Sequence, residues 1–143
     1  MSTFKLILTG LDYVLEFQTI AVLIIGVLIG IIAGSIPGLS SSNTTAIMLP
    51  LTMGMTMHGA LVFLGSIYVG AQYGGSIPAI LFNTPGTTGA SATTLDGFPL
   101  ARKGKAVYAL AISLTASCVG GTIAAIIAIF VMKPAAKIAY QFG

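Results

Sequence analysis

Uncharged polar residues are the groups in this sequence best placed to bind a ligand, and they gather in two stretches. The first reads GSIPGLSSSNTT from residue 34 to 45, and the second reads GGSIPAILFNTPGTTGASATTLDG from residue 74 to 97. Each stretch pairs a Pro-Gly dipeptide with several hydroxyl side chains. Backbone N–H groups and hydroxyls can hold an anion, whereas carbonyl and side-chain oxygens can hold a hard cation.

The first stretch is a candidate carboxylate site. Because proline lacks an amide hydrogen, we expect the preceding helix to break at Pro37 and a half-helix to begin in the serine run. The free N–H groups and the positive dipole end of that half-helix would then face the break. The candidate binding residues are Pro37, Gly38, Ser40, Ser41, Ser42, Asn43 and Thr44. An ordinary helix-capping run is an equally open alternative.

The second stretch is a candidate for either a cation or an anion. Because proline has no N–H, backbone carbonyl oxygens near Pro78 and Pro85 should lack a hydrogen-bond donor. Together with the side-chain oxygens of Asn83 and Thr84, they suit sodium. Anion binding at the start of the following helix is equally compatible, and a structured external loop is the alternative without a site. The candidate binding residues are Gly74, Gly75, Ser76, Asn83, Thr84, Pro85, Gly86 and Thr87, of which Asn83 and Thr84, with Asp96, are candidates for ion coupling.

The remaining reactive residues favour structural roles. Asp96 could cap a turn, accept a proton or pair with Arg102, and a loop-capping aspartate beside a basic cluster is the favoured interpretation. The single histidine, His58, and the single cysteine, Cys118, form no metal-ligand cluster and no disulfide. With no nucleophile–base pair and no phosphate-binding loop, the sequence gives no support for an enzyme or a bound cofactor.

The composition predicts an all-α integral membrane protein. Only 6% of the residues are charged, 56% are apolar, the mean hydropathy is +1.03, and no charged residue occurs between Glu16 and Asp96. At roughly 20 residues per span, 143 residues allow about four to six membrane segments, some of them broken or re-entrant. The few basic residues stand at the ends of apolar runs, which indicates contact with lipid headgroups rather than with nucleic acid.

Breaks in the apolar pattern divide the chain into segments. We expect an interfacial lead-in over residues 1–16 and a transmembrane portion over residues 17–143. Within the latter we expect three apolar runs: one at 17–33, one after residue 45 that is interrupted at Pro50, and one at 59–73. Half of a re-entrant hairpin is expected at 77–82 and a charged loop at 96–105. The last expected segment is a span at 107–132 that Pro134 ends.

Glycines recur every fourth residue from Gly26 through Gly30 and Gly34 to Gly38. On a helix this spacing makes one smooth face, so close packing against another helix is the favoured interpretation for Gly26 and Gly30. Gly34 and Gly38 flank the break and favour approach of the backbone to a ligand. Irregular backbone at membrane depth survives only where protein buries it or where it lines a cavity, so the pair of broken segments indicates a transport site.

Two longer segments carry a resemblance to a known family. GSIPGLSSSNTTAIMLPLT and YGGSIPAILFNTPGTTGASATTLDGFPLARKGKA resemble the TctA-type large membrane subunit of the tripartite tricarboxylate transporters over nearly the whole chain. The family's motifs fall on Pro37 and Gly38 with the hydroxyl run, and on the residues Tyr73, Gly74, Gly75, Ser76, Asn83, Thr84, Pro85, Gly86, Ala92, Thr93 and Asp96.

The resemblance implies secondary active uptake of citrate-like tricarboxylates or related carboxylates across a bacterial inner membrane. It also implies a proton or sodium gradient as the driving force, a small membrane subunit, and a periplasmic solute-binding protein that delivers substrate. The family's large subunit is longer and consists of two related halves as an inverted repeat, so we expect this chain to be its N-terminal portion, with the remaining half as a partner. A non-transporting remnant and a small channel-forming homo-oligomer are the alternatives.

Overall fold

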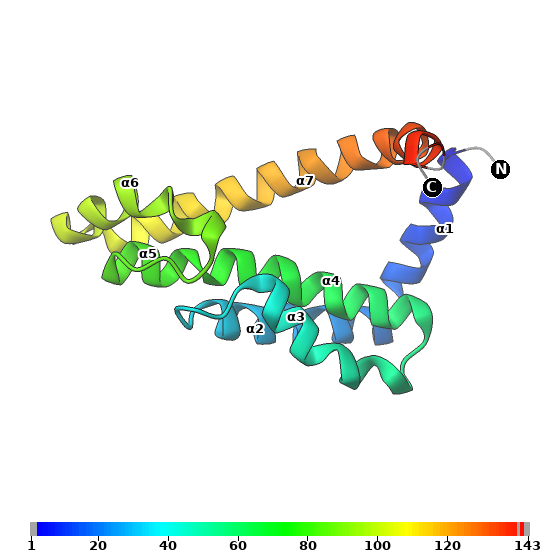
Figure 1. The fold of residues 1–143 in the computed structure, drawn as a ribbon, viewed down its shortest axis with the longest axis horizontal. Helices are drawn as coiled ribbons and strands as arrows, with labels where there is room; N and C mark the ends of the chain where they lie inside the picture. Colours follow the sequence, from blue (N-terminus) through cyan, green and yellow to red (C-terminus); the bar gives the residue numbers. More distant parts are fainter. Residues whose placement is uncertain (1–2, 140, 142–143) are drawn as a thin grey trace.

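The computed structural model describes residues 3–139 and residue 141, and within them every regular element is helical. The elements are α1 (Thr3–Leu15), α2 (Phe17–Gly34), α3 (Ser41–Met48), the 3₁₀ helix η1 (Leu49–Gly54), α4 (Met57–Gly74), α5 (Ser76–Phe82), the 3₁₀ turn η2 (Thr88–Ala90), α6 (Thr93–Leu100), the π-helical turn η3 (Ala101–Lys105) and α7 (Ala106–Ala139). Figure 1 shows α2 and α4 side by side, with α7 diverging from them.

Helices α2 and α4 pack backbone against backbone through glycines on both partners. A Cβ on Gly30 would lie 2.9 Å from the backbone N of Ala71, and one on Gly70 would lie 3.1 Å from the Cα of Val27. Gly26 meets the side chain of Ser66 in the same way. The predicted packing role of the glycine face is therefore what the structure shows at Gly26 and Gly30.

Gly34 continues the same contact, and the predicted approach of its backbone to a ligand or ion stays a prediction. A Cβ on Gly34 would lie 2.7 Å from the Cα of Ala71, so this residue belongs to the helix–helix packing. The fourth glycine, Gly38, leaves the pattern, because its φ of +94° ends any helical spacing and the space beside it is open.

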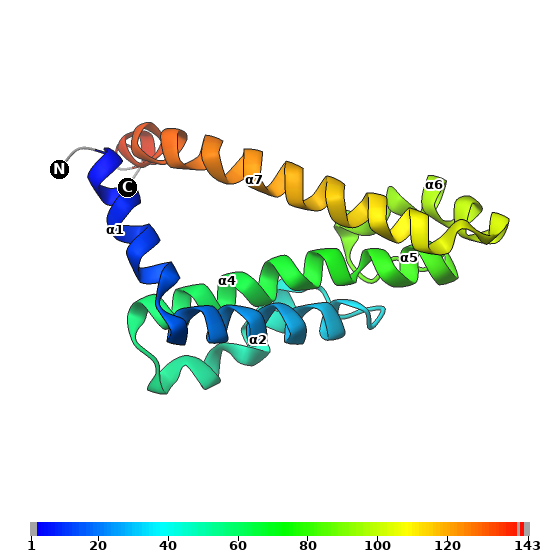
Figure 2. The ribbon, with the colours of Figure 1, turned by 180° about the vertical axis from the view of Figure 1, so that it is seen from behind.

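The lead-in helix α1 meets α2 at Glu16, where the backbone is extended, and Figure 2 shows that the two helices run in different directions. The Tyr13 ring stacks on His58 at the start of α4, with centroids 4.7 Å apart and planes 6° apart. The structure thus gives His58 a packing contact, in agreement with the structural role favoured for it. The placement of α1 at a membrane surface stays a prediction.

Pro50 marks a change of helix type where the sequence predicts an interruption, whereas Pro78 lies within an α-helix. The α-helix of α3 ends at Met48 and gives way to 3₁₀ geometry, with Pro50 in the first turn of η1. Pro78 lies inside the short helix α5, which follows α4 after Gly75, so that α4 and α5 continue in nearly one line in Figure 1. The predicted half-hairpin at residues 77–82 is thus a helix, and the chain returns beyond it as irregular backbone.

Two boundary predictions near the end of the chain are wrong. The charged segment 96–105 is helical rather than a loop, since α6 and η3 run through it and only Gly104, with a φ of +76°, departs from helical geometry. Pro134 does not end the last helix, because α7 continues to Ala139 with the proline inside it. A proline removes one backbone hydrogen bond and bends a helix without always stopping it, and Figure 1 shows the axis of α7 turning near that end.

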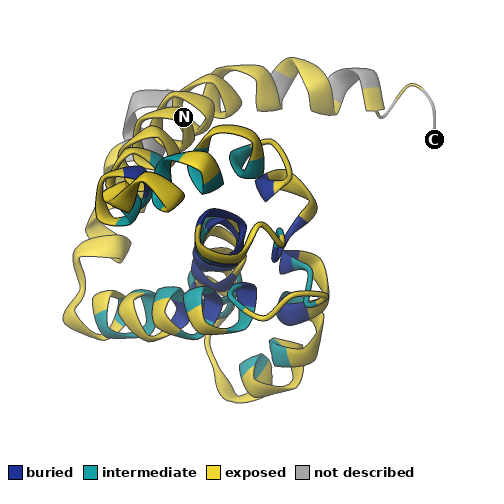
Figure 3. Cartoon of the chain, turned by 90° about the vertical axis from the view of Figure 1, so that its left-hand side faces the viewer, coloured by how far each residue is buried: buried dark blue, intermediate teal, exposed yellow. Residues whose placement is uncertain are grey.

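Buried residues concentrate on the central pair α4 and α5, as Figure 3 shows. Three helical segments of the described chain are long and apolar enough to cross a membrane, namely Phe17–Gly34, Met57–Phe82 and Thr93–Met132. The last of these has no buried residue in its most apolar stretch. The chain is an all-α membrane protein, and its described residues hold three candidate full-length spans beside shorter helices such as α3.

Candidate functional site

The two polar stretches meet beside the carboxyl end of α2, around a small cavity of about 250 Å³. Its walls are Gly38 and Ser40 from the first stretch, and Pro85, Gly86, Thr87, Thr88 and Ser91 from the second. Four of its seven residues carry a hydroxyl group and none carries a charge, although most of the exposed wall is apolar. The structure thus brings together the two Pro-Gly motifs, which are 48 positions apart in the sequence.

The first stretch is held in place by local hydrogen bonds. Leu39 N–H donates to Ile36 O over 3.2 Å, and Gly38 turns the chain with its positive φ. Ser40 is the N-cap of α3, and its side-chain oxygen accepts a hydrogen bond of 3.1 Å from the N–H of Asn43. The capping interpretation therefore describes Ser40 correctly, and the same residue also lines the cavity.

The second stretch turns back at the end of α5. Asn83 takes a left-handed conformation with a φ of +58°, and Thr84 N–H reaches back to Pro78 O over 3.3 Å, which is a common way to end a helix. Gly86 N–H then donates to Gly75 O over 3.1 Å. This bond sets the residues after Pro85, which we call the return segment (residues 84–88), against the junction of α4 and α5.

Gly86 and Gly75 allow this close return. A Cβ on Gly86 would overlap the carbonyl oxygen of Gly34 and lie 2.9 Å from the Cα of Gly75. A Cβ on Gly75 would in turn overlap the Thr87 side chain and lie 2.7 Å from its backbone N. The ends of α2 and α4 and the return segment therefore touch through backbone atoms, and any larger side chain would separate them.

Thr87 is an exception to the usual pairing of buried polar groups. Its side chain is 4% exposed, and its Oγ1 has no hydrogen-bond partner among the residues that the structure describes. The hydroxyls of Ser66 and Thr44 are as deeply buried but donate to Phe63 O and Ser40 O, over 2.8 and 3.1 Å. Buried polar side chains are nearly always paired, so Thr87 Oγ1 requires an explanation.

The other predicted site residues lie around the cavity rather than in its wall. Ser41 and Thr44 are buried in α3, whereas Ser42 and Asn43 on the same helix are exposed. Pro37, Asn83 and Thr84 are exposed, and the Thr84 hydroxyl donates to Phe82 O over 3.2 Å. Gly74 packs against Ile31 of α2. These residues shape the turns and helix ends that position the cavity.

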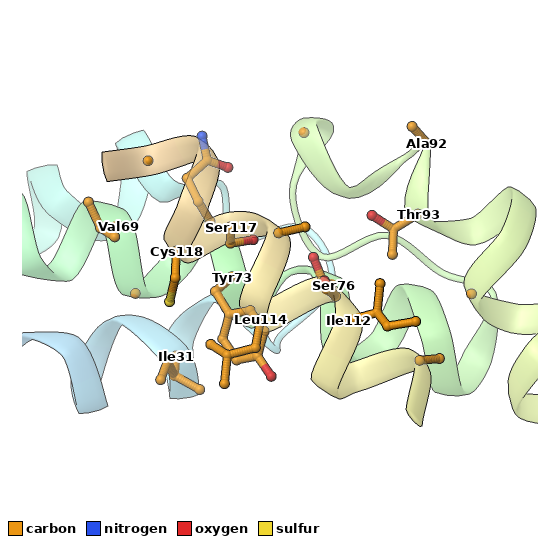
Figure 4. A pocket seen from close by; sticks show the side chains of 18 of the residues that line it. Ile31, Val69, Tyr73, Ser76, Ala92, Thr93, Ile112, Leu114, Ser117 and Cys118 are labelled. Atoms are coloured by element: carbon orange, nitrogen blue, oxygen red, sulfur yellow. The ribbon is translucent and has the colours of Figure 1, made fainter. Parts of the chain in front are cut away.

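Ser76 and Asp96 line a second, larger hollow, a groove of about 930 Å³ between α7 and the α2–α4 pair. Figure 4 shows side chains that line it, Tyr73 and Ser76 from the central helices and Ile112, Ser117 and Cys118 from α7 among them. Its polar side chains include Tyr68 and Gln72, which lie 3.4 Å apart from OH to Nε2. Asp96 is exposed at this groove, and Arg102 lies 6.0 Å from the Phe98 ring centroid.

The sequence analysis missed the groove residues on α7. Ala109, Ser113, Ser117 and Gly121 all line the groove, and they are spaced four residues apart. That spacing puts small side chains on one face of a helix and was visible in the sequence. Among the residues described, no group of three or more His, Cys, Asp or Glu side chains could hold a metal ion.

Comparisons with known proteins agree with the resemblance drawn from the motifs. A sequence model described as the tripartite tricarboxylate transporter TctA family matches residues 20–143. A protein of Agrobacterium vitis, described as an uncharacterized 52.8 kDa protein in the TAR-I ttuC' 3' region, is 40% identical over 119 residues. That match covers 83% of this chain but only 24% of the relative's length. No solved structure matches the chain significantly.

Proposed function

Since the chain belongs to the tripartite tricarboxylate transporter TctA family, we propose that it contributes a carboxylate-binding surface to the membrane subunit of a secondary transporter. The substrate class is citrate-like tricarboxylates or related carboxylates. The observation that carries the proposal is the cavity where Gly38 and Ser40 meet Pro85, Thr88 and Ser91. Two motifs far apart in sequence converge there without a charged residue.

Neutral donors suit a site that must release its ligand. The positive end of the α3 dipole and the first-turn amides of α3 lie directly after Ser40, and each such contact with an anion contributes about 0.3–2 kcal/mol. A fixed arginine would hold a carboxylate more tightly and costs about 2.5–3.5 kcal/mol to insert at mid-membrane. Several weak donors therefore favour reversible binding.

The wider assembly follows from the family. The proposed system works in a bacterial inner membrane, is driven by a proton or sodium gradient, and includes a small membrane subunit and a periplasmic solute-binding protein. The relative in Agrobacterium vitis is about four times as long as the region it shares with this chain. We therefore propose that further transmembrane helices of the large subunit supply the opposite wall of the site, and that the groove beside α7 faces them.

A charge placed in the cavity without loss of the helix cap tests the proposal. Ser40→Asp keeps a side-chain acceptor at the N-cap of α3, since aspartate caps as well as serine. The new carboxylate would repel a carboxylate substrate, so we expect uptake of radiolabelled citrate by cells carrying the complete transport system to fall by about tenfold or more.

Thr56→Asp is the matched control. Thr56 caps α4 by accepting from Gly59 N–H over 3.2 Å, and it stands at the opposite end of that helix from Gly75. We expect Thr56→Asp to retain uptake, with both variants present in the membrane at the wild-type level. Equal uptake by Ser40→Asp and wild type would remove this cavity from the substrate path.

A further inference from the structure

We propose that the Thr87 hydroxyl is a ligand of a sodium ion bound where the end of α2 and the α4–α5 junction meet the return segment. The inference rests on the proposed function, because it identifies sodium rather than a proton as the coupling ion. It also moves the expected ion site away from Asn83 and Thr84. Both of those residues are exposed, and Asn83 acts through its backbone conformation.

The unpaired oxygen is the first observation. Thr87 Oγ1 is buried, lacks a partner in the described part of the chain, and faces Gly75, since a Cβ there would overlap it. The hydrogen bond from Gly86 N–H to Gly75 O already fixes the return segment. The fold therefore does not need the Thr87 hydroxyl to hold this segment in place. Valine would fill the same space without an unsatisfied group. A bound ligand would supply the partner that the buried hydroxyl lacks among the described residues.

Two carbonyl oxygens at helix ends lie in the same region of the chain. Pro78 has no N–H, so Gly74 O, four residues earlier, loses its helical donor and receives only a long contact of 3.5 Å from Ser35 Oγ. Gly34 is the last residue of α2, and its carbonyl oxygen lies against Gly86, next to Thr87. Carbonyls at broken helices and helix carboxyl ends are the groups with which transporters coordinate sodium.

The charge of the junction favours a monovalent ion. The carboxyl end of α2 carries about half a negative charge from its dipole, and neither helix end carries a carboxylate in its last turn. A divalent ion would require carboxylate ligands to offset its charge and its lost hydration. Neutral oxygens with a partial negative charge suit sodium.

Thr87 also connects this junction to the substrate cavity. Thr87 lines the cavity together with Ser40 and Thr88, and its hydroxyl lies against Gly75. An ion on that hydroxyl would fix the return segment and with it the cavity wall. Binding of the ion and of the carboxylate would therefore favour one another.

Sodium-dependent stability tests the ion site without any transport. The protein is purified in detergent in choline chloride and titrated with sodium chloride at constant ionic strength. The midpoint of thermal unfolding is measured at each sodium concentration. We expect a saturable rise with sodium and none with potassium, because a ligand that binds only the folded state stabilises it. Thr87→Val should raise the apparent Kd for sodium about tenfold or more, and Thr87→Ser should leave it within about twofold.

Ser66→Ala is the matched control, because it removes a buried hydroxyl that is paired within α4. We expect it to retain the wild-type Kd. If Thr87→Val does not fold, Thr87→Cys replaces it, since a thiol is a poor ligand for a hard cation, and the same loss is expected.

An unchanged Kd in the Thr87 variants, or no saturable sodium effect on the wild type, would overturn the ion site and leave water as the partner of the hydroxyl. Citrate uptake by a chain that sodium does not stabilise would refute the ion site and keep the proposed function. Sodium stabilisation of a chain without citrate uptake would do the reverse.

Discussion

The two Pro-Gly turns look alike in sequence, yet the structure treats them differently. The turn at Pro37-Gly38 is exposed, and the hydroxyl that follows it caps its own helix. The turn at Pro85-Gly86 is packed against the ends of two helices and leaves a buried hydroxyl unpaired. The hydroxyl after the first turn has its partner in its own helix, whereas the second turn carries a hydroxyl without a partner among the described residues. The same dipeptide can therefore form an exposed turn or a closely packed one, according to what lies against it.

Adding one methyl group at each turn tests most directly whether the two turns differ in packing. Gly86→Ala would put a Cβ against the backbone of both Gly34 and Gly75, which cannot move aside as a side chain can. We expect a loss of stability of about 3 kcal/mol, at the upper end for overpacking, and little folded protein. The yield of monodisperse protein in detergent measures it. A normal yield would show that the packing of the second turn is looser than the structure has it.

Gly38→Ala should have a smaller effect with a different cause. The space beside Gly38 is open, but its φ of +94° is unfavourable for alanine, at a cost of about 1–2 kcal/mol. We expect folded protein with a lowered thermal midpoint. A midpoint as low as that of Gly86→Ala would mean that the two turns are equally constrained, and the contrast between them would fail.

The smallest effect is expected at Asn83, where backbone and side chain can be separated. Asn83→Gly keeps the left-handed conformation, so we expect nearly unchanged stability and uptake, whereas Asn83→Ala should cost about 1 kcal/mol. Thermal midpoint and citrate uptake are measured together. Lost uptake in a stable Asn83→Gly variant would show that the side chain itself binds substrate or ion, as the sequence predicts.

The local features of the fold could be predicted from the sequence because they depend on short spacings. The glycines four residues apart predict a closely packed face on α2, and Pro50 predicts the interruption after α3. The prediction of a loop at 96–105 is wrong because it rests on the charged residues and the proline in this segment. Exposed charges are equally compatible with a helix that projects them outward.

The meeting of the two turns could be anticipated only as two separate candidates. What joins them is the close approach of Gly86 to Gly34 and Gly75, a contact between residues far apart in the chain. No spacing rule predicts such a contact. The groove could not be predicted from the sequence for a similar reason. The row of small residues from Ala109 to Gly121 shows which face of α7 is smooth, but not which helix that face meets.

The position of Cys118 provides an experimental probe of the groove. It is the only cysteine in the sequence, its side chain is exposed, and it lines the groove beside Ser117. Within these residues, a thiol-reactive fluorophore would attach at Cys118 with no engineered residue. Its rate of attachment would report in real time whether another helix covers the groove as the assembly forms or turns over.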